Sequence, residues 1–213
     1  MTPRHHPSGD RLLEHAAGQL GAGRDLVIAA HVAVCPACRA EVRTDEAVGG
    51  ALLDSLDPAP MSEEALAQAL AQIERPTPSQ PAAPTPSRPD WIGFSSPALE
   101  RAWRRRRWAA PGVWVSTVTK GPGPARTYLL RVAAGMSVPR HRHEGVEFVT
   151  VLKGAYGDRG ELHQPGDFAE NDEAVDHKPT VTQDGECVCL ICADAPLVAL
   201  DWVGKLFQPI VRI

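Results

Sequence analysis

One histidine and two cysteines near residue 35 have the spacing of a metal site. His31 precedes Cys35 by four residues, and Cys38 follows three residues later. On a helix, or across a junction between two helices, positions three and four apart face the same side. An imidazole and two thiolates are ligands that zinc accepts readily. The spacing therefore predicts a zinc site with three of its ligands supplied.

A tetrahedral zinc site needs a fourth ligand from the same part of the chain. The histidines available there are His5, His6 and His15. His5 and His6 precede the first predicted helix, where the chain can fold back over the site, and spacing alone does not choose between them. A structural zinc would stabilise a helical part of about 74 residues, because a core of that size is small.

A second group of candidate ligands lies in the C-terminal half. His141 and His143 are two residues apart in a β-rich segment, so their side chains point to one face of a strand. Glu147 returns to that face after a short turn. Two histidines and a carboxylate bind zinc, iron, manganese or nickel. The segment from Gly135 to Gly154 also resembles the first cupin motif at each fixed position.

The fourth ligand of this second site is expected from a later strand. The segment PGDF at 165–168 resembles the turn of the second cupin motif, and His177 is the next histidine after it. His163 is the alternative, but it precedes the turn. We therefore predict His177 as the fourth ligand.

Three further cysteines follow at Cys187, Cys189 and Cys192. Cys187 and Cys189 share one face of a predicted strand. They fit two hypotheses: buried thiols that act as small hydrophobic residues, or a redox-responsive pair near the metal. A disulfide between them would be strained. Both stay candidate redox-sensing residues.

A proline-rich run separates the two groups of ligands. Residues 75–90 contain six prolines, which exclude a helix or a central strand and favour an extended linker. The chain is therefore predicted to consist of a helical zinc-binding domain at 1–74, the linker at 75–90, and a cupin-like domain at 91–213. Such a linker fits two domains that move relative to each other.

The first domain is predicted to be a small helical bundle. Its apolar residues recur at helical spacing from Leu12 to Leu20. Further helices are expected at 25–34, at 36–53 with a proline in the first turn, and from the N-cap Ser62 to residue 74.

The second domain is predicted to be all-β. Short runs rich in branched and aromatic residues alternate with glycine and proline turns, as in a sandwich or barrel. The runs are GVWVSTVT, ARTYLLRVA, EFVTVLKG, ECVCLICA and PLVALDWV. The whole chain is thus expected to be a multidomain α and β protein, in which a helical bundle precedes a cupin β-barrel or jelly roll.

The bulk composition narrows the class of partner. With 22 basic and 26 acidic residues the formal charge is −4, which argues against nucleic acid as the main partner. The arginine run at 104–107 is interpreted as a solvated face or loop. No segment has the roughly 18 consecutive apolar residues that span a membrane, and the N-terminus lacks the apolar core of a signal peptide. We expect a cytoplasmic protein with no direct contact to membrane or nucleic acid.

Both groups of ligands together resemble the zinc anti-sigma factors of the ChrR type. The resemblance rests on the paired histidines at 5–6, the motif at 31–38, the segment DEAVGG at 45–50, and the cupin motif. It favours His6 over His5. The zinc ligands that it implies are His6, His31, Cys35 and Cys38.

This resemblance implies a regulator. The helical domain would bind an extracytoplasmic-function (ECF) sigma factor and block its access to the polymerase core. The cupin would hold a divalent cation, with zinc first among the candidates, and would sense singlet oxygen or a related oxidant. The affinity for the sigma factor would come from apolar helix faces that carry Leu12, Leu13, Leu52, Leu53, Leu66 and Leu70.

A second hypothesis is a cupin metalloenzyme, a dioxygenase or an isomerase, with the zinc domain as an accessory. Three histidines and one glutamate are compatible with oxygen chemistry. The HxxxCxxC module weighs against this hypothesis, because a plain enzyme has no need of one. The sequence therefore favours a regulator without catalytic residues.

Overall fold

The N-terminal part of the chain is helical, as its apolar spacing predicts. The computed structural model describes residues 2–74, 91, 93–94, 96–120 and 125–200. Ser8 caps the first helix by accepting a hydrogen bond from the Arg11 amide, and Pro36 occupies the first turn of the third. The four helices are α1 (Gly9–Ala16), α2 (Ala22–Val32), α3 (Pro36–Asp54) and α4 (Ala65–Glu74).

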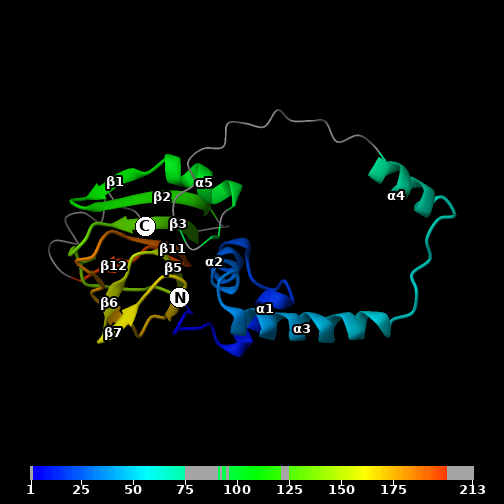
Figure 1. Cartoon of the computed structure of the whole chain (residues 1–213), viewed down its shortest axis with the longest axis horizontal. Coiled ribbons are helices and arrows are strands. Elements are labelled where there is room, and N and C mark those ends of the chain that lie inside the picture. The colour runs from blue at the N-terminus through cyan, green and yellow to red at the C-terminus, as the bar shows by residue number, and fades with distance from the viewer. Residues whose placement is uncertain (1, 75–90, 92, 95, 121–124, 201–213) are drawn as a thin grey trace.

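A 6-stranded antiparallel sheet, in the order β1-β2-β3-β11-β5-β8, follows a short helix α5 (Pro97–Arg104) that the sequence pattern did not predict. Two 3-stranded sheets, β10-β6-β7 and β12-β4-β9, complete a β-sandwich (Figure 1). The predicted fold class, a helical bundle followed by a cupin, is confirmed. The strands are β1 (Arg107–Ala110), β2 (Val113–Lys120), β3 (Arg126–Val132), β4 (His141–Arg142), β5 (Glu147–Lys153), β6 (Tyr156–Asp158), β7 (Glu161–His163), β8 (Phe168–Asn171), β9 (Asp176–His177), β10 (Thr180–Val181), β11 (Cys187–Ala193) and β12 (Val198–Ala199).

Two neighbouring strands of the large sheet, β5 and β11, are covered on both faces. Val149 and Val151 of β5 pack into the interior of the sandwich, whereas Phe148 and Leu152 pack toward the helices. Every residue of β11 is buried in the same alternating way. Two-sided burial explains why both strands are nearly continuous apolar runs and not alternating ones.

Helix α2 covers the outer face of this sheet. Val27 and Ile28 are fully buried, and Thr150 of β5 donates a hydrogen bond of 2.9 Å to the Val27 carbonyl. A side chain at Gly23 would meet Thr127 and Cys192 of the sheet. Helices α1 to α3 and the sheet therefore share one hydrophobic core. The linker at 75–90 lies outside the described residues, and the domain boundaries stay predictions. The shared core differs from the expectation of two domains that move relative to each other.

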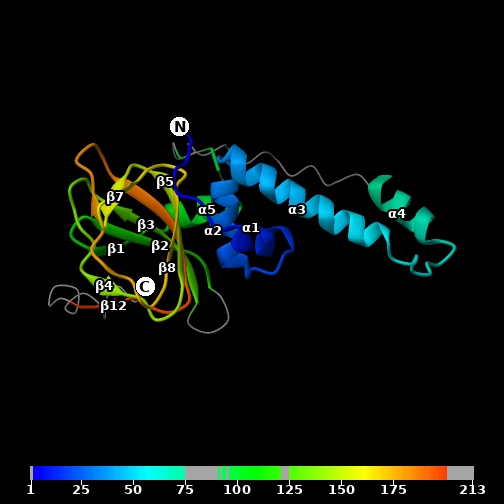
Figure 2. The same ribbon diagram turned by 90° about the horizontal axis from the view of Figure 1, so that it is seen from below.

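The distal helices carry an exposed apolar surface. The C-terminal half of α3 extends beyond the sandwich, and α4 lies at the far end of the molecule (Figures 1 and 2). We call these side chains the apolar stripe: Val48, Leu52, Leu53, Leu56, Met61, Leu66, Leu70 and Ile73, each at least half exposed. Leu13 is also exposed, but Leu12 is buried in the core and is therefore wrongly placed among the predicted docking residues.

The arginine run at 104–107 joins the end of α5 to the start of β1, and its side chains are exposed, as expected. Among the residues that the structure describes, no helix combines the length and the apolar character needed to cross a membrane.

Candidate metal centres

The junction of α2 and α3 brings a histidine and two cysteines together. His31 lies in the last turn of α2, Cys35 is the N-cap of α3, and Cys38 lies in its first turn. The Cys35 amide donates to the His31 carbonyl at 2.9 Å. This tight turn places all three side chains on one side of the junction.

His6 completes this cluster from the N-terminal arm, residues 2–8. Its Nδ1 lies 3.4 Å from both the Cys35 and the Cys38 sulfur, and His31 Nε2 lies 3.2 Å from the Cys38 sulfur. A zinc tetrahedron with two sulfur and two nitrogen ligands has nitrogen–sulfur edges of about 3.6 Å. The four donor atoms lie within 4.8 Å of one another, so the cluster can hold a metal ion. His5 points elsewhere.

Burial sets the protonation of these ligands. It lowers the pKa of His31, which therefore offers a neutral imidazole to a metal. Burial and the neighbouring Cys35 sulfur raise the pKa of Cys38 to about 12. A cation beside Cys38 would favour its thiolate, which is the form that coordinates zinc.

Three histidines converge inside the β-sandwich. His141 of β4 pairs in register with His177 of β9, and His143 follows directly after β4. The His177 Nε2 lies 2.9 Å from Nε2 of His141 and 3.1 Å from Nε2 of His143. All three are buried, with their donor atoms within 4.8 Å of one another. The structure thus brings His177, and not His163, to this site.

Outer partners fix the orientation of two of these rings. The Nδ1–H of His141 donates to the Pro139 carbonyl at 2.8 Å, and that of His177 donates to Asp158 Oδ2 at 2.7 Å. Each ring therefore presents the other nitrogen, Nε2, to the shared centre. Burial lowers the pKa of His141, and burial together with His177 lowers that of His143 to about 4. Neutral imidazoles are the form that binds metal.

Glu147 lies at the edge of this triad. Its Oε2 is 3.7 Å from His143 Nε2, and its carboxylate accepts hydrogen bonds from Asn171 Nδ2 at 3.1 Å and from the Tyr128 hydroxyl at 3.4 Å. Burial raises the pKa of Glu147. A metal beside it would favour the ionised carboxylate.

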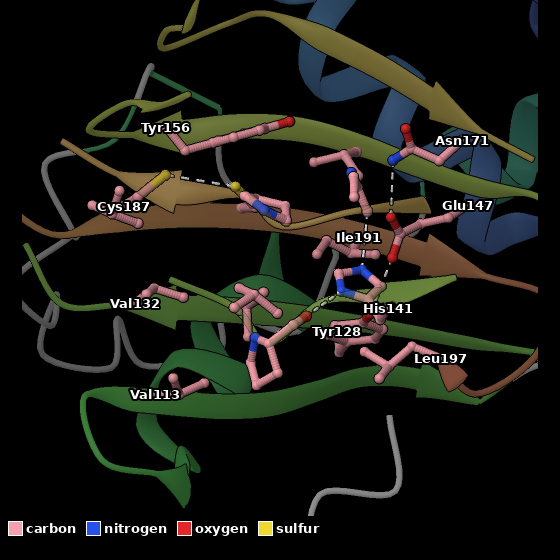
Figure 3. Close-up of a pocket in the computed structure, with 18 of the residues that line it drawn as sticks. Val113, Tyr128, Val132, His141, Glu147, Tyr156, Asn171, Cys187, Ile191 and Leu197 are labelled. Atoms are coloured by element: carbon pink, nitrogen blue, oxygen red, sulfur yellow. Dashed lines mark hydrogen bonds between the residues drawn. The ribbon is translucent and has the colours of Figure 1, made fainter. Parts of the chain in front are cut away.

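A cavity of about 110 Å³ opens beside the triad. Its wall is mainly apolar, with His141, His177 and Glu147 among its few polar residues. Figure 3 shows His141 and Glu147 at one end and Cys187 at the other. The Cys187 and Cys189 sulfurs are 3.7 Å apart and line this wall, whereas Cys192 faces α2. A hydrogen bond with Cys187, together with burial, raises the pKa of Cys189, so its resting form is the thiol.

One turn joins the two groups of candidate metal ligands. The Gly166 carbonyl accepts a hydrogen bond of 2.7 Å from Nδ1–H of His31. Asp167 accepts the backbone N–H groups of Arg4 and His5 at 2.6 and 3.2 Å, and so anchors the N-terminal arm. The chain then enters β8 and reaches Asn171, which holds Glu147. Gly166, which contacts the ligand His31, is therefore only five residues from Asn171, which contacts Glu147.

Sequence reasoning missed these supporting residues. Asp158, Asn171 and the Gly166 carbonyl act through ligands and not as ligands, and no spacing rule identifies such partners. His5 and His163, weighed above as alternative ligands, lie together with Asp167 in a third group of candidate ligands.

Comparison with known proteins identifies the family. Residues 100–195 match the model described as the ChrR cupin-like domain. The chain is 36% identical over 220 residues to the anti-sigma-E factor ChrR of Cereibacter sphaeroides, with 100% of both chains covered. This chain belongs to the ChrR family of anti-sigma factors. Its structure is also similar to that described as Rhodobacter sphaeroides SigE in complex with the anti-sigma ChrR, with a TM-score of 0.74, 31% identity, and coverage of 91% of this chain and 100% of the other.

Membership in the ChrR family confirms the resemblance inferred from the two motifs. It supports a non-enzymatic regulator and weighs against the metalloenzyme hypothesis. The four residues of the first cluster and the three histidines of the second lie within the length of chain that these relatives share.

Proposed function

We propose that this protein binds and inhibits an ECF sigma factor through α3 and α4, and releases it when its cupin domain senses singlet oxygen or a related oxidant. The apolar stripe carries the proposal. It leaves eight large apolar side chains at least half exposed on two distal helices and the segment between them, a surface that a soluble chain rarely leaves uncovered.

The stripe has the geometry of helix-in-groove recognition. Leu66, Leu70 and Ile73 of α4 follow the i, i+4, i+7 spacing of one helical face. Gln68 and Gln72 lie on the opposite face. Helix α4 makes no contribution to the described core, so its apolar face is free to bury against a partner.

Zinc in the first cluster would shape this surface. A site of two sulfur and two nitrogen ligands suits zinc best among the common divalent metals. Because His31 ends α2 while Cys35 and Cys38 begin α3, the metal would fix the angle between the helices. The metal would thereby set the direction in which the exposed C-terminal half of α3 extends toward the partner.

The cupin is the proposed sensor. His141, His143, Glu147 and His177 would hold a divalent cation, zinc first among the candidates, next to the cavity. Cys187 and Cys189 are candidate redox-sensing residues on the same wall. A change at Glu147 would reach Asn171 and β8, then the turn that holds His31, and would shift the population toward a form that releases sigma.

Introducing negative charges into the apolar stripe tests the binding surface. Full-length chain is titrated against the ECF sigma factor encoded in a neighbouring reading frame, and affinity is measured by fluorescence anisotropy. We expect Leu66→Glu with Ile73→Glu to weaken binding more than 100-fold, about 2.7 kcal/mol, whereas the matched control Gln68→Glu binds like wild type. Equal affinity of both variants would contradict docking through this stripe.

A second titration tests the sensor. Release of sigma is followed after exposure to singlet oxygen for the wild type and for His141→Ala. Deleting the cupin domain would be a poor test, because it would expose Val27 and Ile28 of α2, which are buried against the sheet. We expect release from the wild type and at least a tenfold slower release from the variant. The same rate from both would place the sensor outside the cupin cluster.

A further inference from the structure

A third group of candidate metal ligands lies where the N-terminal arm crosses the β-sandwich. It consists of His5 from the arm, His163 at the end of β7, and Asp167 from the turn before β8. One ligand atom from each lies within 4.8 Å of the others. The group is separate from both clusters described above, although His5 precedes His6 in the chain.

Two ring nitrogens in this group are buried without a hydrogen-bond partner. They are Nδ1 of His5 and Nδ1 of His163. His163 is only 5% exposed. Its ring stacks on Tyr156 with the centroids 4.8 Å apart, and the His5 ring lies 4.4 Å away at a tilt of 31°. Burial, followed by the proximity of His5, lowers the pKa of His163. Its imidazole is therefore neutral, with a lone pair available. A buried nitrogen without a partner destabilises the fold unless something binds it.

Asp167 has one lone pair left for a ligand. Its Oδ1 accepts the Arg4 and His5 amides, and its Oδ2 accepts the Gln164 amide at 2.8 Å. Burial alone would raise the pKa of Asp167, but these backbone hydrogen bonds, together with the His5 side chain beside the carboxylate, outweigh it and lower the pKa, so the carboxylate is charged. A carboxylate offers about four acceptor sites, of which the amides occupy three.

The spacing of two of these atoms matches neighbouring ligands of one ion. His5 Nδ1 and Asp167 Oδ2 are 3.2 Å apart, yet the nitrogen has no hydrogen bond. A tetrahedral zinc with bonds of about 2.0–2.1 Å places adjacent ligands about 3.3 Å apart. The other His5 nitrogen, Nε2, faces the exposed Glu161 carboxylate at 3.7 Å, beyond hydrogen-bond distance.

We propose that His5, His163 and Asp167 bind a third divalent cation, zinc by the chemistry of the donor set, which clamps the N-terminal arm to β7 and the following turn. Water or a fourth protein group completes the coordination. Because the arm also delivers His6 to the first cluster, the third ion cross-links that cluster to the cupin.

Equilibrium dialysis against buffered free zinc tests this site in the full-length protein, with bound zinc counted by atomic emission. His163→Phe keeps an aromatic ring stacked on Tyr156 but removes both ligand nitrogens. We expect it to bind one zinc fewer per chain than the wild type. The control His15→Gln changes a histidine that pairs with Asp25 and should keep the full number.

A difference of one equivalent is independent of how many ions the other clusters bind. His5→Gln is the second variant and should lose the same equivalent. Circular dichroism spectra and melting curves verify that each variant is folded. The proposal is overturned if folded His163→Phe and wild type bind equal zinc at every free concentration, or if His15→Gln loses an equivalent as well.

Discussion

The two main groups of candidate metal ligands differ in their surroundings. The His6, His31, Cys35 and Cys38 cluster is built from two thiols and two imidazoles at a helix junction, with only His6 exposed. The cupin triad is built from three buried imidazoles and opens on a cavity of about 110 Å³. Four closely grouped thiol and imidazole donors suit an ion that holds a shape, whereas three imidazoles with Glu147 at their edge, beside a cavity, suit an ion that meets a small molecule.

Their outer partners differ in a second way. The triad is supported from within the cupin, by Pro139 and Asp158. His31 of the first cluster is supported by Gly166, which belongs to the cupin and not to the helices. The shape-holding cluster therefore depends on the β-sandwich, while the triad does not depend on the helices. A structural change in the cupin is therefore expected to alter the helices through the contact between Gly166 and His31.

The largest expected effect comes from removing a sulfur ligand. Structural zinc contributes roughly 10–16 kcal/mol to small zinc domains, so Cys38→Ala should lose one zinc equivalent, the order of the α2–α3 junction and all binding to sigma. Zinc content and anisotropy on the same sample measure this. Cys187→Ala is the control and should keep both. A Cys38→Ala chain that still bound sigma would show that the first cluster does not shape the docking surface.

Gly166→Ala is expected to have the next largest effect. Gly166 has φ of +93°, and a Cβ there would lie 2.8 Å from Pro3 Cγ and 3.1 Å from Val34 Cγ2. Strain and overpacking together should cost about 2–4 kcal/mol in urea unfolding.

Gly160→Ala is the matched control for that change, because Gly160 has φ of +86° with no atom near its added Cβ. It should cost only about 1 kcal/mol. Equal losses from the two variants would mean that the arm and the α2–α3 turn do not pack tightly against Gly166.

Asp158→Asn should weaken the triad without touching the first cluster. The Asp158 carboxylate orients His177, and loss of such an outer partner typically lowers metal affinity 10–100-fold. Competition with a chromophoric chelator measures the affinity. Glu173→Gln removes an exposed negative charge nearby and should leave it unchanged. If both variants weaken binding alike, the effect of Asp158 is long-range charge and not ring orientation.

Thr150→Val should have the smallest effect. It removes the hydrogen bond from the sheet to the Val27 carbonyl of α2, worth about 0.5–1.5 kcal/mol. Thr44→Val removes an exposed bond of the same kind within α3 and should be close to neutral in urea unfolding. A Thr150→Val chain no less stable than Thr44→Val would mean that this contact adds nothing to the docking of α2.

Much of the candidate site could be predicted because the types of the ligand residues and their short spacings indicate metal binding. His31, Cys35 and Cys38 lie within two turns of helix, and His141 and His143 lie two apart on a strand, so local geometry alone brings each set together. The β11 run CVCLICA also held a signal that the prediction did not use. A strand that is apolar at every position must be covered on both faces, and α2 is the cover.

By itself the sequence determined the helical and β parts, the ligand types, and the two main metal clusters, since these depend on contacts between near neighbours in the chain. The tertiary structure places His6, which the resemblance favoured, beside the sulfurs, and His177, which was predicted as the fourth ligand, beside His141. It alone decided that Gly166 supports His31. Each of these choices depends on the register of β4 with β9, or on the path of the arm across the turn before β8. Such contacts join residues 29 to 163 positions apart, and spacing carries little information at that distance.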